Sequence, residues 1–449
     1  MTLMGLDVGT TGMKIGVYRA EDGRLKLEGQ YSRSYEINTY NNGQFSDIEP
    51  AKWQAAFADG CRELDSLAAE VDAIGISGTT PGFVAMDRDG EPLYPAILML
   101  DQRSRAQAAE IIEKIGLRVL LDATGNMPVA GGCSLASMLW LRDHRPEVFR
   151  NAACFGHTNT FMAKWLTGGF AIDPSSASLT ALYNTVANDF SWNLEIAGAF
   201  GVRAEQLPEV ISAFESPGRV HPAAARELGL KKEPLVIIGG NDAVLAAYSI
   251  GIREPGDFVN VNGTCEISMV CLDRCYSSTR YNVRAHVIPG RWLTLYVMNA
   301  EGKAFEWFQR VFCSEMSAQV FYQHFLPEAV DAWLDRESTV TYTPFLMGSR
   351  YSQAPLKAEF LGLTPETSRE ELLAAMVRGL AEYQREHLKE ISLLQPIKPV
   401  VHVTGGAVNP SLIRAKKKWM LGGAEYVFEE QSSMKGAAML ALERLQRGA

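Results

Sequence analysis

Glycine and threonine residues meet at the tip of an apparent β-hairpin near the start of the chain. The segment Gly9-Thr10-Thr11-Gly12 is preceded by Asp7 and followed by Lys14. Glycine lets a phosphate group approach the backbone N–H groups of such a tip, and Lys14 could add a cation nearby. Asp7 is a hard carboxylate suited to magnesium. Taken alone, the segment fits an ordinary hairpin with a turn-stabilising aspartate equally well.

A second candidate lies where the apolar run 235–238 ends in Gly239-Gly240-Asn241-Asp242, before an apolar segment that predicts a helix over 243–250. Asp242 at a helix N-terminus could be a simple capping residue. Considered together with a phosphate-binding hairpin, it becomes the group that accepts the proton of an attacking hydroxyl. The helix dipole is expected to keep its carboxylate ionised.

A third candidate follows the apolar run 400–403, where Gly405-Gly406 precedes a helix expected to begin near Pro410 or Ser411. Two glycines could let the base and ribose of a nucleotide lie against bare backbone, although many strand-to-helix turns use glycine for geometry alone. The sequence contains no nucleophile elbow, zinc-peptidase helix, P-loop or dinucleotide fingerprint, which argues against those classes of enzyme.

The elements that must position these residues are those of an α/β chain. Apolar runs at 235–238 and 400–403 predict buried strands, and an apolar periodicity over 369–388, with Ser368 and Glu371 as a capping box, predicts a helix. The pattern of residues 4–18 is similar to that of 258–270. We interpret this as two similar domains facing each other across a cleft, with a boundary near 243–256; two unrelated hairpins are the alternative.

Composition narrows the class further. The 449 residues are 47% hydrophobic and carry a net charge of −9, which argues against a broad surface for nucleic acid or an anionic membrane. The basic run Lys416-Lys417-Lys418 is interpreted as a solvated helix face. Seven scattered cysteines do not describe a disulfide framework, and no segment predicts export or a membrane span, so we expect a cytoplasmic protein.

In this order, the segments resemble the FGGY carbohydrate kinase family over nearly the whole chain. The resemblance rests on residues 5–14, 76–78 with Gly82, 95–103, 166–168, 173–180, 239–243, 263–264, 344–348, 405–406 and 436–438. It implies two ribonuclease-H-like domains of the actin and hexokinase type, over residues 1–245 for sugar and phosphate binding and 246–449 for ATP binding. It also implies ATP and Mg²⁺ as cofactors and a small sugar or polyol as the substrate, and it is compatible with a homodimer.

The resemblance assigns roles to individual residues. It implies that Asp7 positions magnesium and that Asp242 is the general base. It places ATP against Gly9, Thr10, Thr11, Lys14, Gly263, Thr264, Gly405, Gly406 and Asn409. It places the sugar against Thr79, Thr80, Pro81, Asp101, Arg103, Asn241 and Asp242, although a structural salt bridge is as good an interpretation of Asp101 and Arg103.

The departures from the family fall in the sugar pocket. Xylulose-type members carry Gln-Met-His, and glycerol kinases Gln-Arg-Glu, where this chain has Thr79-Thr80-Pro81. The overall spacing resembles the xylulose-type members more, so a ketopentose such as xylulose or ribulose is the predicted acceptor. An ATP-binding sensor or assembly protein of the actin type, without a sugar acceptor, is the alternative.

Overall fold

Two six-stranded sheets that share one arrangement over five of their strands organise the molecule. The computed structural model describes residues 1–349, 351, 356–406 and 408–448. In each sheet an antiparallel three-stranded meander continues into two further parallel strands, in the orders β3-β2-β1-β6-β13 and β17-β15-β14-β20-β21. The repeat predicted from residues 4–18 and 258–270 is therefore the first hairpin of each sheet, and the predicted pair of ribonuclease-H-like folds is confirmed.

The bounds of the strands follow the apolar runs closely. The first sheet contains β1 (Thr2–Val8), β2 (Gly12–Glu21), β3 (Arg24–Ser34), β6 (Ala73–Gly78), β12 (Gly218–Arg219) and β13 (Leu235–Asn241). The second contains β14 (Phe258–Asn262), β15 (Glu266–Leu272), β16 (Asn282–Ala285), β17 (Trp292–Met298), β20 (Val400–Thr404) and β21 (Glu425–Phe428). The predicted strands at 235–238 and 400–403 are thus confirmed as parts of β13 and β20.

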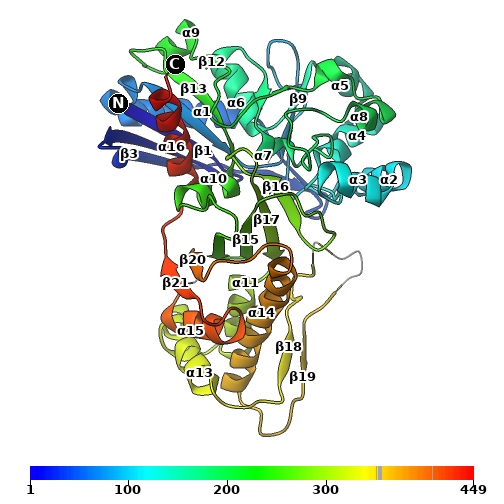
Figure 1. The fold of residues 1–449 in the computed structure, drawn as a ribbon, viewed down its shortest axis with the longest axis vertical. Coiled ribbons are helices and arrows are strands. Elements are labelled where there is room, and N and C mark those ends of the chain that lie inside the picture. Colours follow the sequence, from blue (N-terminus) through cyan, green and yellow to red (C-terminus); the bar gives the residue numbers. More distant parts are fainter. Residues whose placement is uncertain (350, 352–355, 407, 449) are drawn as a thin grey trace.

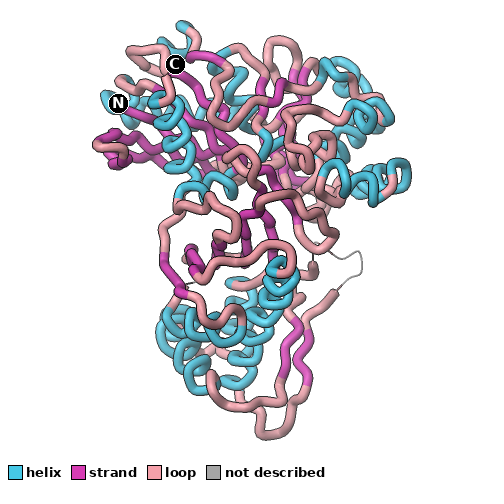
Figure 2. Tube along the Cα trace, in the orientation of Figure 1, coloured by secondary structure: helices cyan, strands magenta, loops and turns pink. Residues whose placement is uncertain are grey.

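Smaller sheets and the helices make up the rest of the two halves, with the first half of the chain above the second in Figure 1. A five-stranded sheet contains β4 (Asn38–Tyr40), β5 (Phe45–Ile48), β7 (Gly82–Met86), β8 (Ala96–Leu98) and β9 (Cys154–Gly156), and two strand pairs are β10 (Ala171–Ile172) with β11 (Glu209–Val210) and β18 (Thr341–Thr343) with β19 (Glu359–Leu361). Figure 2 shows that helices flank the strands in both halves.

The helices of the first half are α1 (Ala51–Ala69), α2 (Arg105–Ile115), α3 (Leu117–Thr124), α4 (Ser134–His144), α5 (Pro146–Asn151), α6 (Thr158–Thr167), α7 (Pro174–Ala177), α8 (Leu194–Ala199), α9 (Pro222–Glu227) and α10 (Asp242–Ser249). Those of the second half are α11 (Gly302–Phe312), α12 (Ala318–Val320), α13 (Leu326–Trp333), α14 (Arg369–Ser392), α15 (Pro410–Trp419) and α16 (Ser433–Gln446). The predicted helix 369–388 is α14. The Ser368 hydroxyl accepts from the Glu371 N–H, as a capping residue should.

The last helix, α16, returns to the first sheet. It packs against β1, β6 and β13, and it lies beside the N-terminus in Figure 1. Buried residues of β14 and β15, such as Val259 and Met269, share one hydrophobic cluster with α10 and α16. The predicted domains, 1–245 and 246–449, stay a prediction, and α16 is the part of the second that lies against the first sheet.

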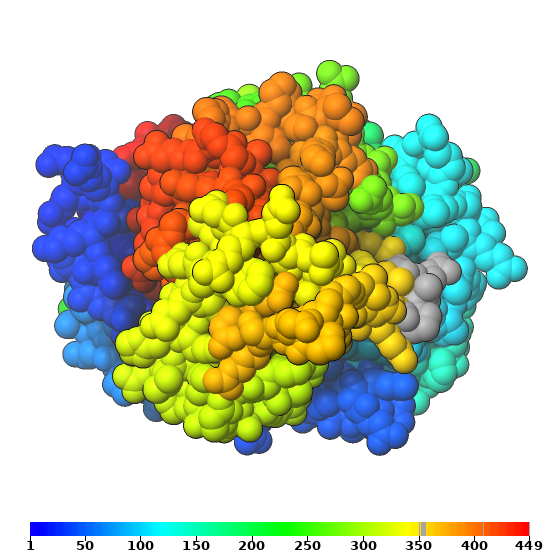
Figure 3. Space-filling model, turned by 90° about the horizontal axis from the view of Figure 1, so that it is seen from below, coloured from blue at the N-terminus to red at the C-terminus, as the bar shows by residue number. Residues whose placement is uncertain are grey.

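Apolar residues of both halves pack together in one hydrophobic cluster. Seen from below in Figure 3, residues of the second half cover the centre of the molecule, and the first half shows around its rim. Each of the seven cysteines is a free thiol. Among the described residues, no helix is long and apolar enough to cross a membrane.

Glycines set how closely α16 approaches the sheet, and this generates a prediction. A Cβ atom on Gly75 of β6 would lie 2.0 Å from the Ala437 carbonyl oxygen of α16. We expect Gly75→Ala to lower the free energy of unfolding by about 2 kcal/mol or more, because backbone must move to relieve the overlap. Chemical denaturation measures this.

Gly198→Ala is the matched control, since no atom lies within 4 Å of a Cβ built there. It should leave stability unchanged or slightly improved. Equal denaturation midpoints for the two variants would contradict the account of α16.

Candidate active site

Three parallel strands bring the first candidate residues to one edge of the first sheet. Asp7 of β1 pairs with Ser77 of β6, which in turn pairs with Gly240 of β13. The carboxyl ends of parallel strands share an edge of the sheet. Along this edge lie, in order, Asp7, the loop that starts at Thr79, and Asn241-Asp242. Residues some 70 and 235 positions apart in the chain are thus neighbours in register.

The first hairpin tip is held in place by its surroundings. The Tyr35 hydroxyl donates to the carbonyl oxygens of Gly9 and Gly12, at 2.5 and 3.0 Å. The Thr10 and Thr79 hydroxyl oxygens are 2.9 Å apart and share a hydrogen bond. The predicted phosphate-binding tip therefore touches the predicted sugar loop, which suits a transfer between the two ligands.

Asp7 is a partly buried carboxylate with polar neighbours. Burial raises its pKa above the ordinary value of 3.8, whereas hydrogen bonds from the Ser433 and Ser77 hydroxyls and the nearby Lys14 ammonium lower it. The distance from Ser77 Oγ to Asp7 Oδ1 is 2.9 Å. Groups of three or more histidine, cysteine or acidic side chains that could hold a metal are absent from the described part of the chain. A lone carboxylate fits Mg²⁺, which keeps most of its waters and shares substrate phosphates.

Asn241, and not Asp242, caps α10. The Asn241 side-chain oxygen accepts from the Val244 N–H at 3.2 Å, and Asp242 is the first residue of the helix. The Asp242 carboxylate accepts from the N–H of the next residue, Ala243, at 2.8 Å. The capping interpretation of Asp242 is therefore wrong, and its carboxylate is available to a ligand.

The electrostatics of Asp242 also differ from expectation. Burial, and then the charge of Asp7, raise its pKa to about 7; the Ala243 N–H and Arg284 act in the opposite direction. The prediction that the helix N-terminus keeps this group fully ionised is wrong, because desolvation and a second carboxylate outweigh the dipole. A pKa near neutrality suits a general base.

Arg284 is a residue that the sequence did not reveal. It is buried on β16 of the second sheet, and its charge lowers the pKa values of both Asp242 and His157. Ala285, beside it, donates its N–H to Ser178 Oγ of the first half at 3.0 Å. An arginine in a short strand carries no motif, so only the docking of β16 onto the first half places this cation near the base.

The loop Thr79-Thr80-Pro81 is buried against α6. The Thr158 hydroxyl donates to the Thr79 carbonyl oxygen at 3.2 Å, and the Thr80 hydroxyl donates to the Gly78 carbonyl oxygen at 3.0 Å. The loop is thus fixed before any ligand arrives. Its contact with a sugar stays a prediction.

Asp101 and Arg103 form a buried ion network with Asp47. The guanidinium donates to Asp101 Oδ2 and Asp47 Oδ2, both at 2.8 Å, and to the Tyr94 hydroxyl at 3.1 Å, and it lies over the ring of Phe45. These contacts match the structural salt bridge. Direct contact of either residue with a sugar stays a prediction.

The second hairpin borders a cavity of about 780 Å³ in the second half of the molecule. Four predicted ATP-binding residues line it, namely Gly263, Thr264, Gly406 and Asn409, together with Gly302, Phe305, Glu306, Tyr322, Gln323, Leu326, Val408 and Leu412. Its volume and mixed apolar and polar lining suit a nucleotide. The structure thus gathers residues that are almost 150 positions apart.

The two glycines after β20 serve different purposes. Gly405 has φ of +105°, and a Cβ there would lie 2.0 Å from the Asn262 carbonyl oxygen, so it permits the close approach of β20 to β14. Among the described residues, no atom lies within 4 Å of a Cβ at Gly406, so this residue leaves the cavity open. Asn409 caps α15 by accepting from the Leu412 N–H at 2.9 Å.

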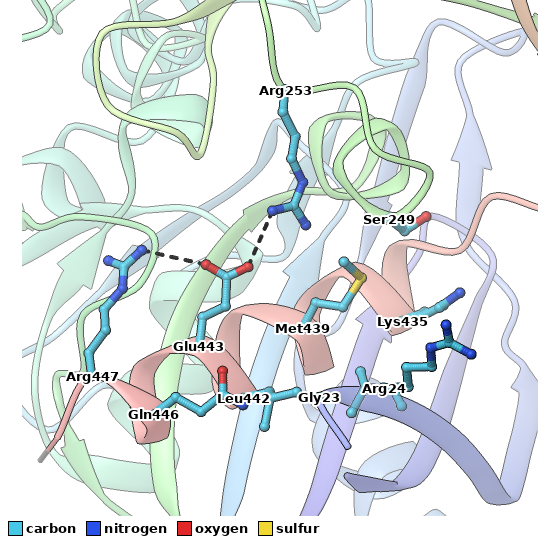
Figure 4. A pocket seen from close by; sticks show the side chains of 11 residues that line it. Gly23, Arg24, Ser249, Arg253, Lys435, Met439, Leu442, Glu443, Gln446 and Arg447 are labelled. Carbon is cyan, nitrogen blue, oxygen red and sulfur yellow. Dashed lines mark hydrogen bonds and ion pairs between the residues drawn. The ribbon is translucent and has the colours of Figure 1, made fainter. Parts of the chain in front are cut away.

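A hollow of about 760 Å³ lies outside this arrangement, between α16, the end of α10 and the β2–β3 turn. In Figure 4, Arg253 and Arg447 approach Glu443 from opposite sides, at 3.6 and 3.5 Å. None of the predicted site residues lines it. We therefore do not include it in the active site.

Comparison with known proteins agrees with this geometry. Residues 2–249 match the model of the N-terminal domain of the FGGY family of carbohydrate kinases. The chain is 26% identical over 448 residues to the xylulose kinase of Lactococcus lactis, covering 98% of this chain and 87% of that protein.

Two solved structures show the same fold. Xylulose kinase from Rhodospirillum rubrum has a TM-score of 0.90 and 21% identity, covering 98% of this chain and 89% of its own. Gluconate kinase from Lactobacillus acidophilus has a TM-score of 0.87 and 20% identity, covering 100% and 90%.

The raised pKa of Asp242 predicts a cost in stability. In the unfolded chain this carboxyl ionises near its ordinary 3.8, whereas in the fold it does so near 7. Below about pH 4 the carboxyl is neutral in both states and does not destabilise the fold. As the pH rises to about 7, the unfolded chain ionises and the fold does not, so stability is lost. We expect Asp242→Asn to raise the free energy of unfolding by roughly 1–3 kcal/mol at pH 8 and to have little effect at pH 4.

Thermal unfolding of both proteins at the two pH values measures this difference. Asp122→Asn, at an exposed aspartate paired with Arg118, is the control and should show no gain at pH 8. An Asp242→Asn variant that is no more stable than the wild type at pH 8 would show that the carboxylate is not strained in the fold.

Proposed function

The chain belongs to the FGGY family of carbohydrate kinases, and we propose that it transfers the γ-phosphate of ATP to a hydroxyl of a ketopentose such as xylulose. The carboxylate of Asp242 carries the proposal. It lies at the edge of the first sheet near Asp7, it is not used as the cap of α10, and its pKa is near neutrality. Membership of the family favours this activity over the ATP-binding sensor without an acceptor.

In the proposed reaction, the sugar binds against the loop Thr79-Thr80-Pro81 and Asn241. Asp242 accepts the proton of the attacking hydroxyl as the oxygen bonds to the γ-phosphorus and ADP leaves. The side chains of Asp101 and Arg103 bind β5 of the five-stranded sheet through Ser46 and Asp47. This role does not depend on contact with the sugar. Xylulose is the choice because the L. lactis relative is a xylulose kinase.

ATP is proposed to bind in the cavity of the second half, with adenosine beside Gly405, Gly406 and Asn409. Its phosphates would extend between Gly263-Thr264 and the first tip, Gly9 to Thr11 with Lys14. Mg²⁺ would be held by Asp7 and would offset the charge of the phosphates. Closure of the two halves would exclude water, a competing acceptor.

Two expectations about the protein's setting stay predictions: the cytoplasm as its compartment, and a homodimer as its assembly. Neither nucleic acid nor a membrane has a place in the proposed reaction.

The first test is coupled ADP release with Mg-ATP against ketopentoses, aldoses, polyols and sugar acids. We expect strong stimulation by one ketopentose. Asp242→Ala should lower kcat about 10²–10⁴-fold, because the base is lost, without weakening ATP binding. The matched control is Asp122→Ala, which should retain full turnover.

Normal turnover by Asp242→Ala would remove the assignment of the base. ADP release that no acceptor stimulates would favour the sensor alternative.

The pH dependence of the same assay tests the state of Asp242. At low Mg-ATP concentration, kcat/KM for the sugar should decrease as the pH is lowered through about 7, because the base must be unprotonated. The midpoint should move to lower pH as Mg-ATP saturates, because a cation beside Asp7 offsets the charge that raises the pKa of Asp242. A midpoint that stays between pH 4 and 5 at every Mg-ATP concentration would contradict this.

A further inference from the structure

Lys416 is not part of a solvated helix face. Only 5% of the residue is exposed, whereas Lys417 and Lys418 on the same helix are exposed. The ammonium group donates to Asn260 Oδ1 at 2.8 Å and to Glu301 Oε1 at 3.1 Å, and it also contacts Asn262 Oδ1 and Glu266 Oε1. The interpretation of the basic run is therefore wrong for its first residue.

The four acceptors are themselves buried and bonded to one another. Asn260 donates to Glu266 Oε1 at 2.8 Å, and Asn262 donates to Asn260 Oδ1 at 3.1 Å. None of the four is more than 2% exposed. Burial raises the pKa of Glu301 above its ordinary value, and the charge of Lys416 acts in the opposite direction. We call Lys416, Asn260, Asn262, Glu266 and Glu301 the lysine network.

The lysine network joins four of the elements around the cavity, although not α13 or the segment 321–325 before it, which also line the cavity. Asn260 and Asn262 belong to β14, Glu266 to β15, Glu301 precedes α11, and Lys416 lies on α15. Asn262 also donates to the Thr404 carbonyl oxygen at the end of β20, at 3.4 Å. A single ammonium thus lies directly behind the hairpin tip that faces the cavity.

The tip itself is fastened to α11 next to Glu301. The Thr264 carbonyl oxygen accepts from the Glu301 N–H at 3.2 Å, and the Gly263 carbonyl oxygen accepts from the Gly302 N–H at 3.0 Å. The Gly263 N–H donates to the Cys265 carbonyl oxygen at 3.1 Å, which closes the tip. Any displacement of Glu301 would therefore move Gly263 and Thr264 with it.

Stability alone is a poor reason for such an arrangement. Two carboxylates and one ammonium lose their hydration here, and well-packed apolar residues often stabilise a fold as well or better. What charged hydrogen bonds add is direction, since each fixes an angle as well as a distance. The charged hydrogen bonds of the lysine network can therefore fix how four elements are oriented around the cavity.

We propose that Lys416 is a positioning residue for nucleotide binding: through Asn262, Glu266 and Glu301 it fixes the Gly263-Thr264 tip in the orientation that receives the phosphates of ATP. The inference rests on the proposed function, because it takes the cavity as the ATP site. It adds a residue outside the cavity lining on which affinity for ATP depends.

The test compares two variants with the wild type. Lys416→Met removes the cation and leaves two buried carboxylates facing each other. A triple variant, Lys416→Met with Glu266→Gln and Glu301→Gln, removes all three charges with side chains of similar size. Calorimetric titration with Mg-ATP gives the dissociation constant, thermal unfolding gives stability, and steady-state assays give KM for ATP and for the sugar.

We expect Lys416→Met to unfold at a lower temperature and to bind ATP about 10-fold or more weakly, because small displacements of a binding group have large effects. The triple variant should regain most of the lost thermal stability yet keep the weakened ATP binding. In both, KM for the sugar should stay within about twofold, since the sugar loop belongs to the first half. Lys417→Met, the exposed neighbour, should match the wild type in every measurement.

Wild-type ATP affinity in the folded triple variant would show that the lysine network only balances its own charges, and would overturn the proposal. So would wild-type affinity in Lys416→Met. Failure of the wild type to bind ATP would instead count against the proposed function, which keeps the two failures apart.

Discussion

The pairing of β1, β6 and β13 is the constraint on which the rest of the structure depends. Parallel register sets Asp7, Ser77 and Gly240 in one row, so that the two carboxylates of the site share an edge. The close approach of α16, which glycines permit, holds this sheet from behind and brings Ser433 to Asp7. A phosphate carrying several negative charges can approach such an edge only if cations and N–H groups compensate, and the hairpin tips supply the latter.

The electrostatics of this edge depend on the same constraint. Bringing Asp242 close to Asp7 in a partly dry environment raises its pKa, although the start of α10 acts in the opposite direction. The fold therefore holds a carboxylate at a position where ionisation is unfavourable, as functional sites often do. Arg284, which reaches the site from the second sheet, moderates this effect and makes the state of the base depend on contact between the two halves.

Much of the fold could be predicted from short stretches of sequence. The apolar runs of β13 and β20, the capped helix α14 and the repeated hairpins are local signals, and the structure confirms each. The structure gathers Gly263, Thr264, Gly406 and Asn409 around one cavity, and their contact with ATP stays a prediction. The role of Asn241 as the cap of α10 was missed, because Asn and Asp are nearly equal as capping residues and adjacent positions cannot be separated by type alone.

Long-range contacts account for what local signals could not show. Lys416 lies four residues after the buried Leu412 and three before Trp419, so helical periodicity places it on the inner face of α15. Its charge and its two lysine neighbours favoured the opposite interpretation. A lysine can occupy such a face only where carboxylates from elsewhere in the chain meet it, and neither Glu266 nor Glu301 reveals that from its own surroundings. A charged residue on the apolar face of a helix therefore indicates a buried partner elsewhere in the chain, and it does not mean that the helical pattern ends there.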